Sequence, residues 1–217
     1  LLLEARDPET GEPLDEISVQ ANIVTFIGAG HETTANALTW TLYLLARAPE
    51  WAQTIRAEAD AVLFDDAATP ARLEKLVMTR AALEESMRLY PPVPFMSREA
   101  LGPDRIAGIR VPKGTLVTIA PWVLHRHRTL WEEPDLFDPS RFLPENRQNI
   151  PRFAYLPFGA GPRVCIGQSF SMQEAILILA RALRAIDLEL AGDGAVAPLH
   201  RVTLRPDRPV VMHLRAR

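Results

Sequence analysis

The 217-residue sequence contains a single cysteine, and this scarcity excludes several kinds of site. One cysteine cannot form an internal disulfide, a CxxC redox pair or a zinc ribbon, because each of these needs more than one thiol. It also cannot hold an iron–sulfur cluster. From composition alone, two interpretations of the cysteine remain: a buried, inert thiol, or one thiolate with a chemical role.

The sequence also lacks an excess of charge of either sign and lacks a long apolar run. Lys and Arg number 24 against 27 Asp and Glu, a formal charge of −3. This balance gives no electrostatic footprint for nucleic acid or for an anionic membrane. No apolar run approaches the ~18 residues of a membrane span. With 47% hydrophobic residues, the composition is that of a folded globular chain, and the length suggests about one domain.

Helices account for most of the expected secondary structure. Proline is absent from about residue 15 to residue 47, where apolar residues recur at helical spacing, so we predict one long central helix there. Similar patterns predict further helices over 49–63, 72–89 and 167–186.

Small sheets are expected between and after these helices. A short hairpin is predicted over 105–111 and a further strand over 115–120. Residues 121–162 are rich in proline and should be mostly irregular, with short helical turns. Residues 202–204 and 210–212 are predicted strands. The fold class is therefore mainly α with small β-sheets.

The segment 158–167 (Phe-Gly-Ala-Gly-Pro-Arg-Val-Cys-Ile-Gly) surrounds the cysteine immediately before the last predicted helix. Its glycines and proline favour a compact turn that presents Cys165 near the helix N-terminus, where free N–H groups and the helix dipole favour a thiolate. Arg163 adds a cation suited to a carboxylate. A small buried cysteine in a glycine turn is the alternative. The glycine spacing fits neither a dinucleotide fingerprint nor a phosphate loop.

A second distinctive segment, 29–34 (Ala-Gly-His-Glu-Thr-Thr), lies midway along the long helix. Gly30 costs a helix about 1 kcal/mol relative to alanine, which suggests that something approaches the backbone closely there. Ala29 and Thr33 share one face, and the threonine hydroxyl can bond back to the helix or distort it. A zinc site of the H-E-x-x-H type is excluded because Ala35 stands where the second histidine is needed. A polar notch in a core helix is the alternative.

The segment 158–167 closely resembles the haem-thiolate loop of the cytochrome P450 family, Phe-x-x-Gly-x-Arg-x-Cys-x-Gly, and every fixed position is filled, including Gly161. The resemblance implies that Cys165 is the axial thiolate ligand of the iron of haem b, a ligand type that favours O–O cleavage. It also implies that Arg163 pairs with a haem propionate and that Phe158 packs beside the thiolate.

The segment 29–34 resembles the oxygen-activation motif of the same family, Ala-Gly-x-Glu-Thr-Thr. The resemblance assigns Glu32 and Thr33 as the acid–alcohol pair that passes protons during oxygen activation. Ala29 and Gly30 would leave space over the haem.

Glu85 and Arg88 form an i, i+3 pair on a predicted helix, which taken alone is most often a solvated surface pair. Together with the residues that follow, however, the pair resembles the Glu-x-x-Arg helix of the family, and 137–142 resembles its later Pro-x-Arg-Phe stretch. The resemblance implies a buried structural network of Glu85, Arg88 and Arg141. Removal of one partner would then leave a buried charge without compensation.

Other family positions concern the haem propionates and the substrate. Arg98 occupies the place of a propionate-binding arginine, and His125 or Arg126 are further candidates for that role. Residues 93–97 would line the substrate pocket, and their side chains suggest an apolar one.

The three motifs occur in family order, so the resemblance implies that 1–217 is the C-terminal, haem-binding part of a single cytochrome P450 domain whose N-terminal half is absent here. It implies a monooxygenase that inserts one atom of O2 into an organic, apolar substrate. Electrons would come from NAD(P)H through a separate ferredoxin or flavoprotein reductase, since no flavin or cluster motif is present. A bacterial-like, cytoplasmic protein is expected, with no nucleic-acid partner and no membrane segment. A peroxide-driven peroxygenase and a truncated, non-catalytic or weakly haem-binding fragment are the alternatives.

Overall fold

A computed structural model describes residues 4–7, 9–65, 68–192 and 195–217. Within these residues the fold is mainly α with small β-sheets, as the sequence predicts, and the sheets are four pairs of strands. The helices are α1 (Glu16–Arg47), α2 (Pro49–Val62), α3 (Pro70–Leu73), α4 (Val77–Leu89), α5 (Pro121–Leu124), α6 (Pro144–Arg147) and α7 (Gln168–Ala185), with 3-10 turns η2 (Pro139–Phe142) and η3 (Gly161–Arg163). The strands are β1 (Met96–Glu99), β2 (Asp104–Ile106), β3 (Ile109–Val111), β4 (Leu116–Ile119), β5 (Ile186–Leu190), β6 (Pro198–His200), β7 (Leu204–Pro206) and β8 (Met212–Ala216).

The long helix α1 confirms the prediction made from its proline-free, helically spaced sequence. It begins where the Asp15 carboxylate accepts a hydrogen bond from the Ser18 N–H at 2.6 Å, a typical N-cap. It ends at Arg47, just before Pro49 opens α2. Its C-terminal half is buried around Trp40 and Leu45, whereas most side chains of its N-terminal half are exposed.

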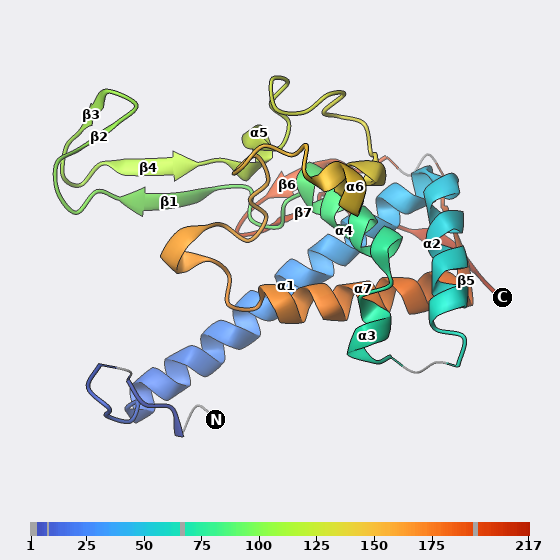
Figure 1. Cartoon of the computed structure of the whole chain (residues 1–217), viewed down its shortest axis with the longest axis horizontal. Helices are drawn as coiled ribbons and strands as arrows, with labels where there is room; N and C mark the ends of the chain where they lie inside the picture. The colour runs from blue at the N-terminus through green and yellow to red at the C-terminus, as the bar shows by residue number, and fades with distance from the viewer. Residues whose placement is uncertain (1–3, 8, 66–67, 193–194) are drawn as a thin grey trace.

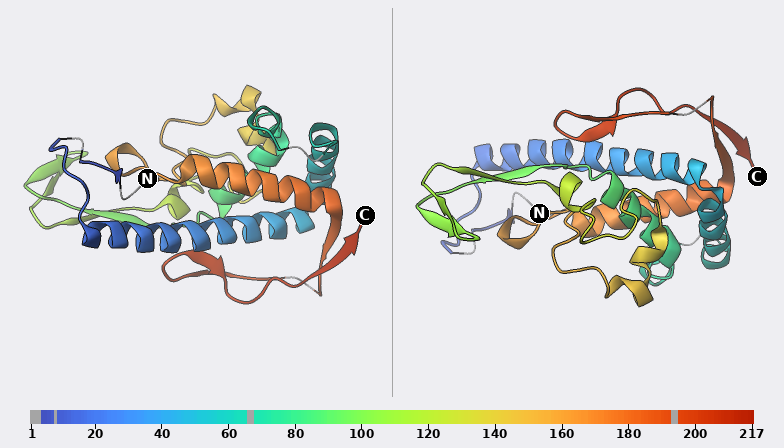
Figure 2. Two further views of the ribbon diagram at one scale, coloured as in Figure 1. Left: turned by 90° about the horizontal axis from the view of Figure 1, so that it is seen from below. Right: turned by 90° about the horizontal axis from the view of Figure 1, so that it is seen from above.

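Four helices, α1, α2, α4 and α7, pack around the main hydrophobic core (Figure 1). Leu83 and Met87 of α4 meet Ile176 and Leu179 of α7 in that core. The N-terminal end of α7 lies beside the middle of α1 in all three views (Figures 1 and 2). This placement brings together the two segments that carry the sequence motifs.

The predicted helix 72–89 is wrong in one respect, because the chain divides it into α3 and α4. The first turn of α4 is capped by a residue of α2: the Glu58 carboxylate accepts hydrogen bonds from the N–H groups of Met78 at 2.6 Å and Thr79 at 2.9 Å. It also accepts one from the Thr79 hydroxyl at 2.7 Å. A carboxylate at this position satisfies N–H groups that a new helix start exposes.

The sheets confirm part of the strand prediction. The hairpin of β2 and β3 turns at Ala107 and Gly108, both with positive φ, as a tight two-residue turn requires. β4 is also confirmed, and it pairs with β1, which was not predicted. Figures 1 and 2 show these four strands extending away from the helices as one arm.

The C-terminal strands were predicted too early in the chain. β7 begins only at Leu204, the last residue of the predicted strand 202–204, while residues 201–203 form a bend. β8 begins at Met212, the last residue of the predicted strand 210–212. The bend exists because Thr203 turns inward to bond with α1, which local β-propensity does not reveal.

Candidate functional site

The loop that carries the cysteine is a tight turn closed by its own backbone. The N–H of Cys165 donates to the carbonyl of Phe158 at 3.0 Å, and the N–H of Val164 donates to that of Gly161 at 3.0 Å. Gly159 and Gly161 have φ of 73° and 75°, a region that side chains with a Cβ rarely adopt. The glycines therefore allow the chain to fold back just before α7.

Cys165 is exposed and unpaired, and it lies just before the first residue of α7. The alternative of a small buried cysteine is therefore wrong, since Cys165 is exposed among the described residues. Phe158 is half-buried and packs against the main core, which anchors the start of the loop. A Cβ on Gly159 would lie 3.7 Å from the Met96 sulfur, so β1 runs against the same loop.

The turn of α1 that carries the second motif is regular helix. The Thr33 hydroxyl donates to the carbonyl of Ala29 at 2.8 Å, the backbond that the sequence allows. Ala29 and Gly30 are exposed, and a Cβ added to Gly30 would meet no described atom within 4 Å. The chain itself therefore leaves the surface at Gly30 bare.

Glu32, the acidic member of the predicted pair, is bonded away from its own helix. Its carboxylate accepts a hydrogen bond from the hydroxyl of Thr203 at 2.7 Å. Thr203 also accepts one from the side-chain amide of Asn36 at 3.0 Å. Sequence reasoning named neither of these two partners.

The structure brings Glu85, Arg88 and Arg141 together. Arg88 donates to both carboxylate oxygens of Glu85 at 2.6 and 2.8 Å, and both side chains are fully buried. The Arg141 Nε lies 3.5 Å from the Glu85 carboxylate, and the N–H of Asp138 donates to it at 2.9 Å. Burial raises the pKa of Glu85, and the Arg88 guanidinium opposes that rise. The pair is therefore not the solvated surface pair of the alternative interpretation.

Arg88 also holds the segment that follows α5. It donates to the backbone carbonyls of His125, Pro134 and Leu136 at 2.8, 2.7 and 3.0 Å. Its guanidinium lies 5.0 Å from the centre of the Trp131 ring. One buried cation thus organises a long stretch of irregular backbone.

His125 cannot take the propionate role, because both of its ring nitrogens are used inside the chain. Nδ1 lies 3.2 Å from the carbonyl of Arg88, and Nε2 accepts from the N–H of Leu156 at 2.8 Å. The side chain is fully buried, and this desolvation lowers its pKa to about 4.

The arginines differ in their surroundings. The Arg126 guanidinium lies 3.7 Å from the centre of the Trp122 ring, and burial lowers its pKa to about 10. Arg98 on β1 and Arg163 in η3 are both exposed. Arg98 donates to the carbonyl of Ser97 at 2.9 Å. The two exposed guanidinium groups are the better placed to meet an anion from outside the chain.

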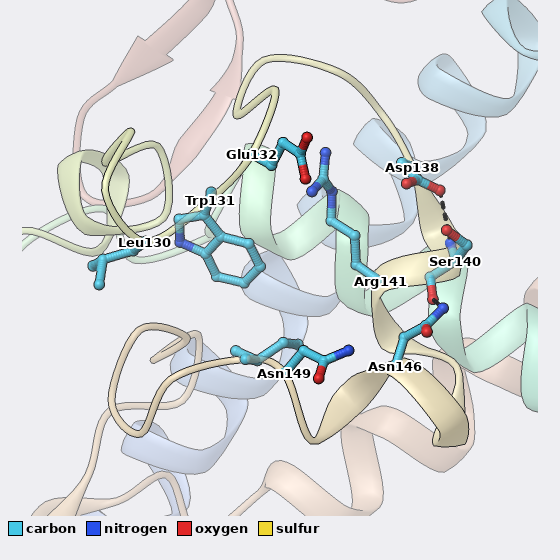
Figure 3. A pocket seen from close by; sticks show the side chains of 9 residues that line it. Leu130, Trp131, Glu132, Asp138, Ser140, Arg141, Asn146 and Asn149 are labelled. Atoms are coloured by element: carbon cyan, nitrogen blue, oxygen red, sulfur yellow. Dashed lines mark hydrogen bonds between the residues drawn. The ribbon is translucent and has the colours of Figure 1, made fainter.

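A pocket lies apart from the cysteine loop, beside the Glu-x-x-Arg network (Figure 3). Arg141 and Trp131 line it, and the Ser140 N–H donates to the Asp138 carboxylate while the Asn146 amide donates to the Ser140 carbonyl. These bonds shape the backbone around Arg141. The pocket therefore belongs to the scaffold rather than to the cysteine.

Comparison with known proteins assigns the chain to a family. The family model described as Cytochrome P450 matches residues 1–212, so the chain belongs to the cytochrome P450 family. It is 38% identical over 205 residues to cyclooctatin synthase of Streptomyces melanosporofaciens, covering 94% of this chain and 43% of that protein. It is also 38% identical to cytochrome P450 4V2 of Homo sapiens, covering 100% of this chain and 42% of that protein.

The fold agrees with the same family. The crystal structure of the cytochrome P450DA heme domain superposes with a TM-score of 0.92 at 36% identity, covering 100% of this chain and 48% of that one. The chain thus spans less than half the length of the curated relatives described here. No helix among the described residues has the length and apolarity needed to cross a bilayer.

The residues at the site fit the haem that membership of this family implies. Cys165 offers an exposed thiol, and the described residues hold no group of three His, Cys, Asp or Glu side chains that could complete a metal site. A cysteine thiolate is the axial ligand that haem-thiolate iron takes, so this exposed thiol fits that group. The bare backbone at Gly30 leaves room beside α1 for a flat group.

Proposed function

We propose that this chain is the haem-binding part of a haem-thiolate monooxygenase, and that the N-terminal part of the same domain completes the enzyme. One observation carries the proposal: an exposed, unpaired Cys165 is presented close before the start of α7, and α7 begins beside the middle of α1, the helix that carries the 29–34 motif. The family match over residues 1–212 supports it.

Cys165 would hold the haem iron through its thiolate, and the free N–H groups at the start of α7 would stabilise that charge. Arg163 and Arg98 would bind the propionates, because both guanidinium groups are exposed and a guanidinium pairs well with a carboxylate. When bound, the haem supplies the activation of O2 and the oxidising chemistry. The surrounding residues supply position, charge and protons.

Glu32 and Thr33 would carry protons to the oxygen side of the site. The Thr33 hydroxyl is fixed to the Ala29 carbonyl, which still leaves its oxygen able to accept a further hydrogen bond. The Glu32 carboxylate is exposed at the surface of α1, where it can exchange protons with water. Together they form a short acid–alcohol relay beside the bare Gly30.

The substrate would be an organic molecule with an apolar surface. Val93 and Phe95 lie just before β1 and are exposed, so apolar side chains face outward next to the cysteine loop. Electrons would come from NAD(P)H through a separate ferredoxin or flavoprotein reductase, and membership of the cytochrome P450 family supports such a redox partner.

The experiment that tests the proposal is turnover of the full-length, haem-loaded protein under 18O2 with NAD(P)H and a reductase. A monooxygenase places one labelled oxygen atom in the product and the other in water. Turnover with hydrogen peroxide alone, and none with NAD(P)H and O2, would support the peroxygenase instead. Failure of the 217-residue chain, purified on its own, to retain haem would support the non-catalytic fragment.

A further inference from the structure

A hydrogen-bonded chain joins α1 to the C-terminal strands beside Glu32. The Thr203 hydroxyl donates to the Glu32 carboxylate at 2.7 Å and accepts from the Asn36 amide at 3.0 Å. Thr203 and Asn36 are only 6% and 9% exposed, so both are shielded from competing water. Because the amide occupies one lone pair of the hydroxyl, the hydroxyl proton is directed to Glu32.

The turn that carries Thr203 is itself held in place. The N–H of Leu204 donates to the carbonyl of Pro92 at 2.9 Å, and the carbonyl of Leu204 accepts from the Trp40 indole at 3.2 Å. The Thr203 carbonyl accepts from the N–H of Arg201 at 3.1 Å. These bonds tie the turn to α1 and to the segment after α4, so the hydroxyl has a fixed position.

Glu32, by contrast, lies on an exposed part of α1, where a long carboxylate side chain would otherwise sample several rotamers. The Thr33 hydroxyl next to it is bonded to its own helix and gives Glu32 no anchor. Of the hydrogen bonds described here, the one from Thr203 is what restrains the Glu32 carboxylate.

We propose that Thr203 is a positioning residue for Glu32: its hydroxyl selects the carboxylate rotamer from which Glu32 passes protons. This inference rests on the proposed function, in which Glu32 and Thr33 form the proton relay. Thr203 lies outside every motif of the sequence and reaches Glu32 only through the fold.

The test compares Thr203→Val, which removes the hydroxyl, with Thr203→Ser, which keeps it. Both are made in the full-length, haem-loaded protein, and hydrogen peroxide released per NAD(P)H oxidised is measured with a reductase present. When protons arrive too late or at the wrong oxygen atom, O2 that has taken up two electrons and two protons leaves as hydrogen peroxide instead of forming product and water. Thr203→Val should raise this ratio about threefold. The loss of one hydrogen bond to a charged group is large enough to cause a change of this size. Thr203→Ser should restore the wild-type ratio.

A second measurement does not depend on turnover. The infrared spectrum of the wild type minus that of Glu32→Gln isolates the stretching band of the Glu32 carboxylate. The band should shift in Thr203→Val and return in Thr203→Ser. Thr41→Val is the matched control, because the Thr41 hydroxyl is buried on the same helix and donates to the Ala37 carbonyl of its own helix.

The outcomes separate this inference from the proposed function. The positioning role alone is overturned if the protein holds haem through a thiolate and turns over, but Thr203→Val has the same Glu32 band and the same peroxide ratio as the wild type. An equal rise in Thr41→Val would also overturn it, because the effect would then be general to the helix. A protein without a thiolate-bound haem overturns the proposed function first, and this inference with it.

Discussion

The buried ring of His125 hydrogen-bonds the backbone carbonyl of Arg88, with Nδ1 at 3.2 Å from the oxygen. Its other nitrogen, Nε2, accepts from the N–H of Leu156, at the approach to the cysteine loop. The carbonyl needs a donor and the N–H needs an acceptor, so the ring is neutral with its proton on Nδ1. One imidazole thus links the Glu-x-x-Arg helix to the chain that leads to Cys165.

This link makes stability depend on pH. Burial lowers the pKa of His125 from 6.5 to about 4 in the folded protein. A histidine whose folded pKa is depressed gives its full stabilisation above pH 6.5 and loses it as pH falls from 6.5 towards 4. The difference is worth about 3 kcal/mol across that window, from 1.36 kcal/mol per pKa unit.

The measurement is the free energy of unfolding by urea at several pH values for the wild type and for His125→Asn, which does not titrate. The wild-type curve should fall more steeply below pH 6.5 than the variant curve. Parallel curves would show that His125 is not the group responsible. His213, exposed on β8, gives the control variant His213→Asn, which should leave the slope unchanged.

Arg88→Met should be among the most damaging single changes in the scaffold. It leaves the fully buried Glu85 carboxylate without its partner and frees three carbonyls that Arg88 holds. Loss of one partner of a buried pair costs about 3–5 kcal/mol. Arg147→Met, which breaks the more exposed pair with Glu84, is the comparison and should cost less. Urea unfolding that gives equal losses for the two variants would contradict the buried network.

Glu58→Ala should destabilise the start of α4. The carboxylate accepts hydrogen bonds from two N–H groups and a hydroxyl there, and loss of a cap costs about 1–2 kcal/mol. Gln53→Ala, exposed and uncharged on the same helix α2, is the control and should change little. Hydrogen exchange at the amides of Met78 and Thr79 should also speed up in Glu58→Ala alone. Unchanged exchange at both amides would mean that the cap is not formed in solution.

Gly30→Leu should weaken haem binding, while the matched variant Gly28→Leu should not. No described atom lies within 4 Å of a Cβ at Gly30 or at Gly28, so alanine at either position should stabilise α1 by up to about 1 kcal/mol. The two glycines point to nearly opposite sides of the helix. Haem titration should show weaker binding for Gly30→Leu and unchanged binding for Gly28→Leu. Equal haem affinities for the two leucine variants would show that Gly30 does not face the haem.

The elements that the sequence predicted are those set by local signals. α1 follows from a capping Asp15, an uninterrupted helical pattern and Pro49 beyond its end. The hairpin turn follows from Gly108 and its neighbour. The division between α3 and α4 was missed because the group that caps α4 comes from α2, and no local pattern of 72–89 contains it.

The same distinction holds for the site. The cysteine loop, the 29–34 turn and the Glu85–Arg88 pair carry dense motifs and were found from the sequence alone. Thr203 and Asn36 were not found, because each is an ordinary polar residue until the fold brings the C-terminal turn against α1. His125 was found but given the wrong role, since its burial arises from packing between distant segments.

The central claim is that Cys165 holds a haem iron as its thiolate ligand, and the absorption spectrum of the reduced, CO-treated protein tests it most directly. The full-length wild-type protein should show the red-shifted Soret band of a thiolate-ligated haem. Cys165→Ala should lose that band, while Thr41→Val, far from the loop in sequence, should keep it. A wild-type protein that binds haem without this band, or a Cys165→Ala variant that retains it, would contradict the account.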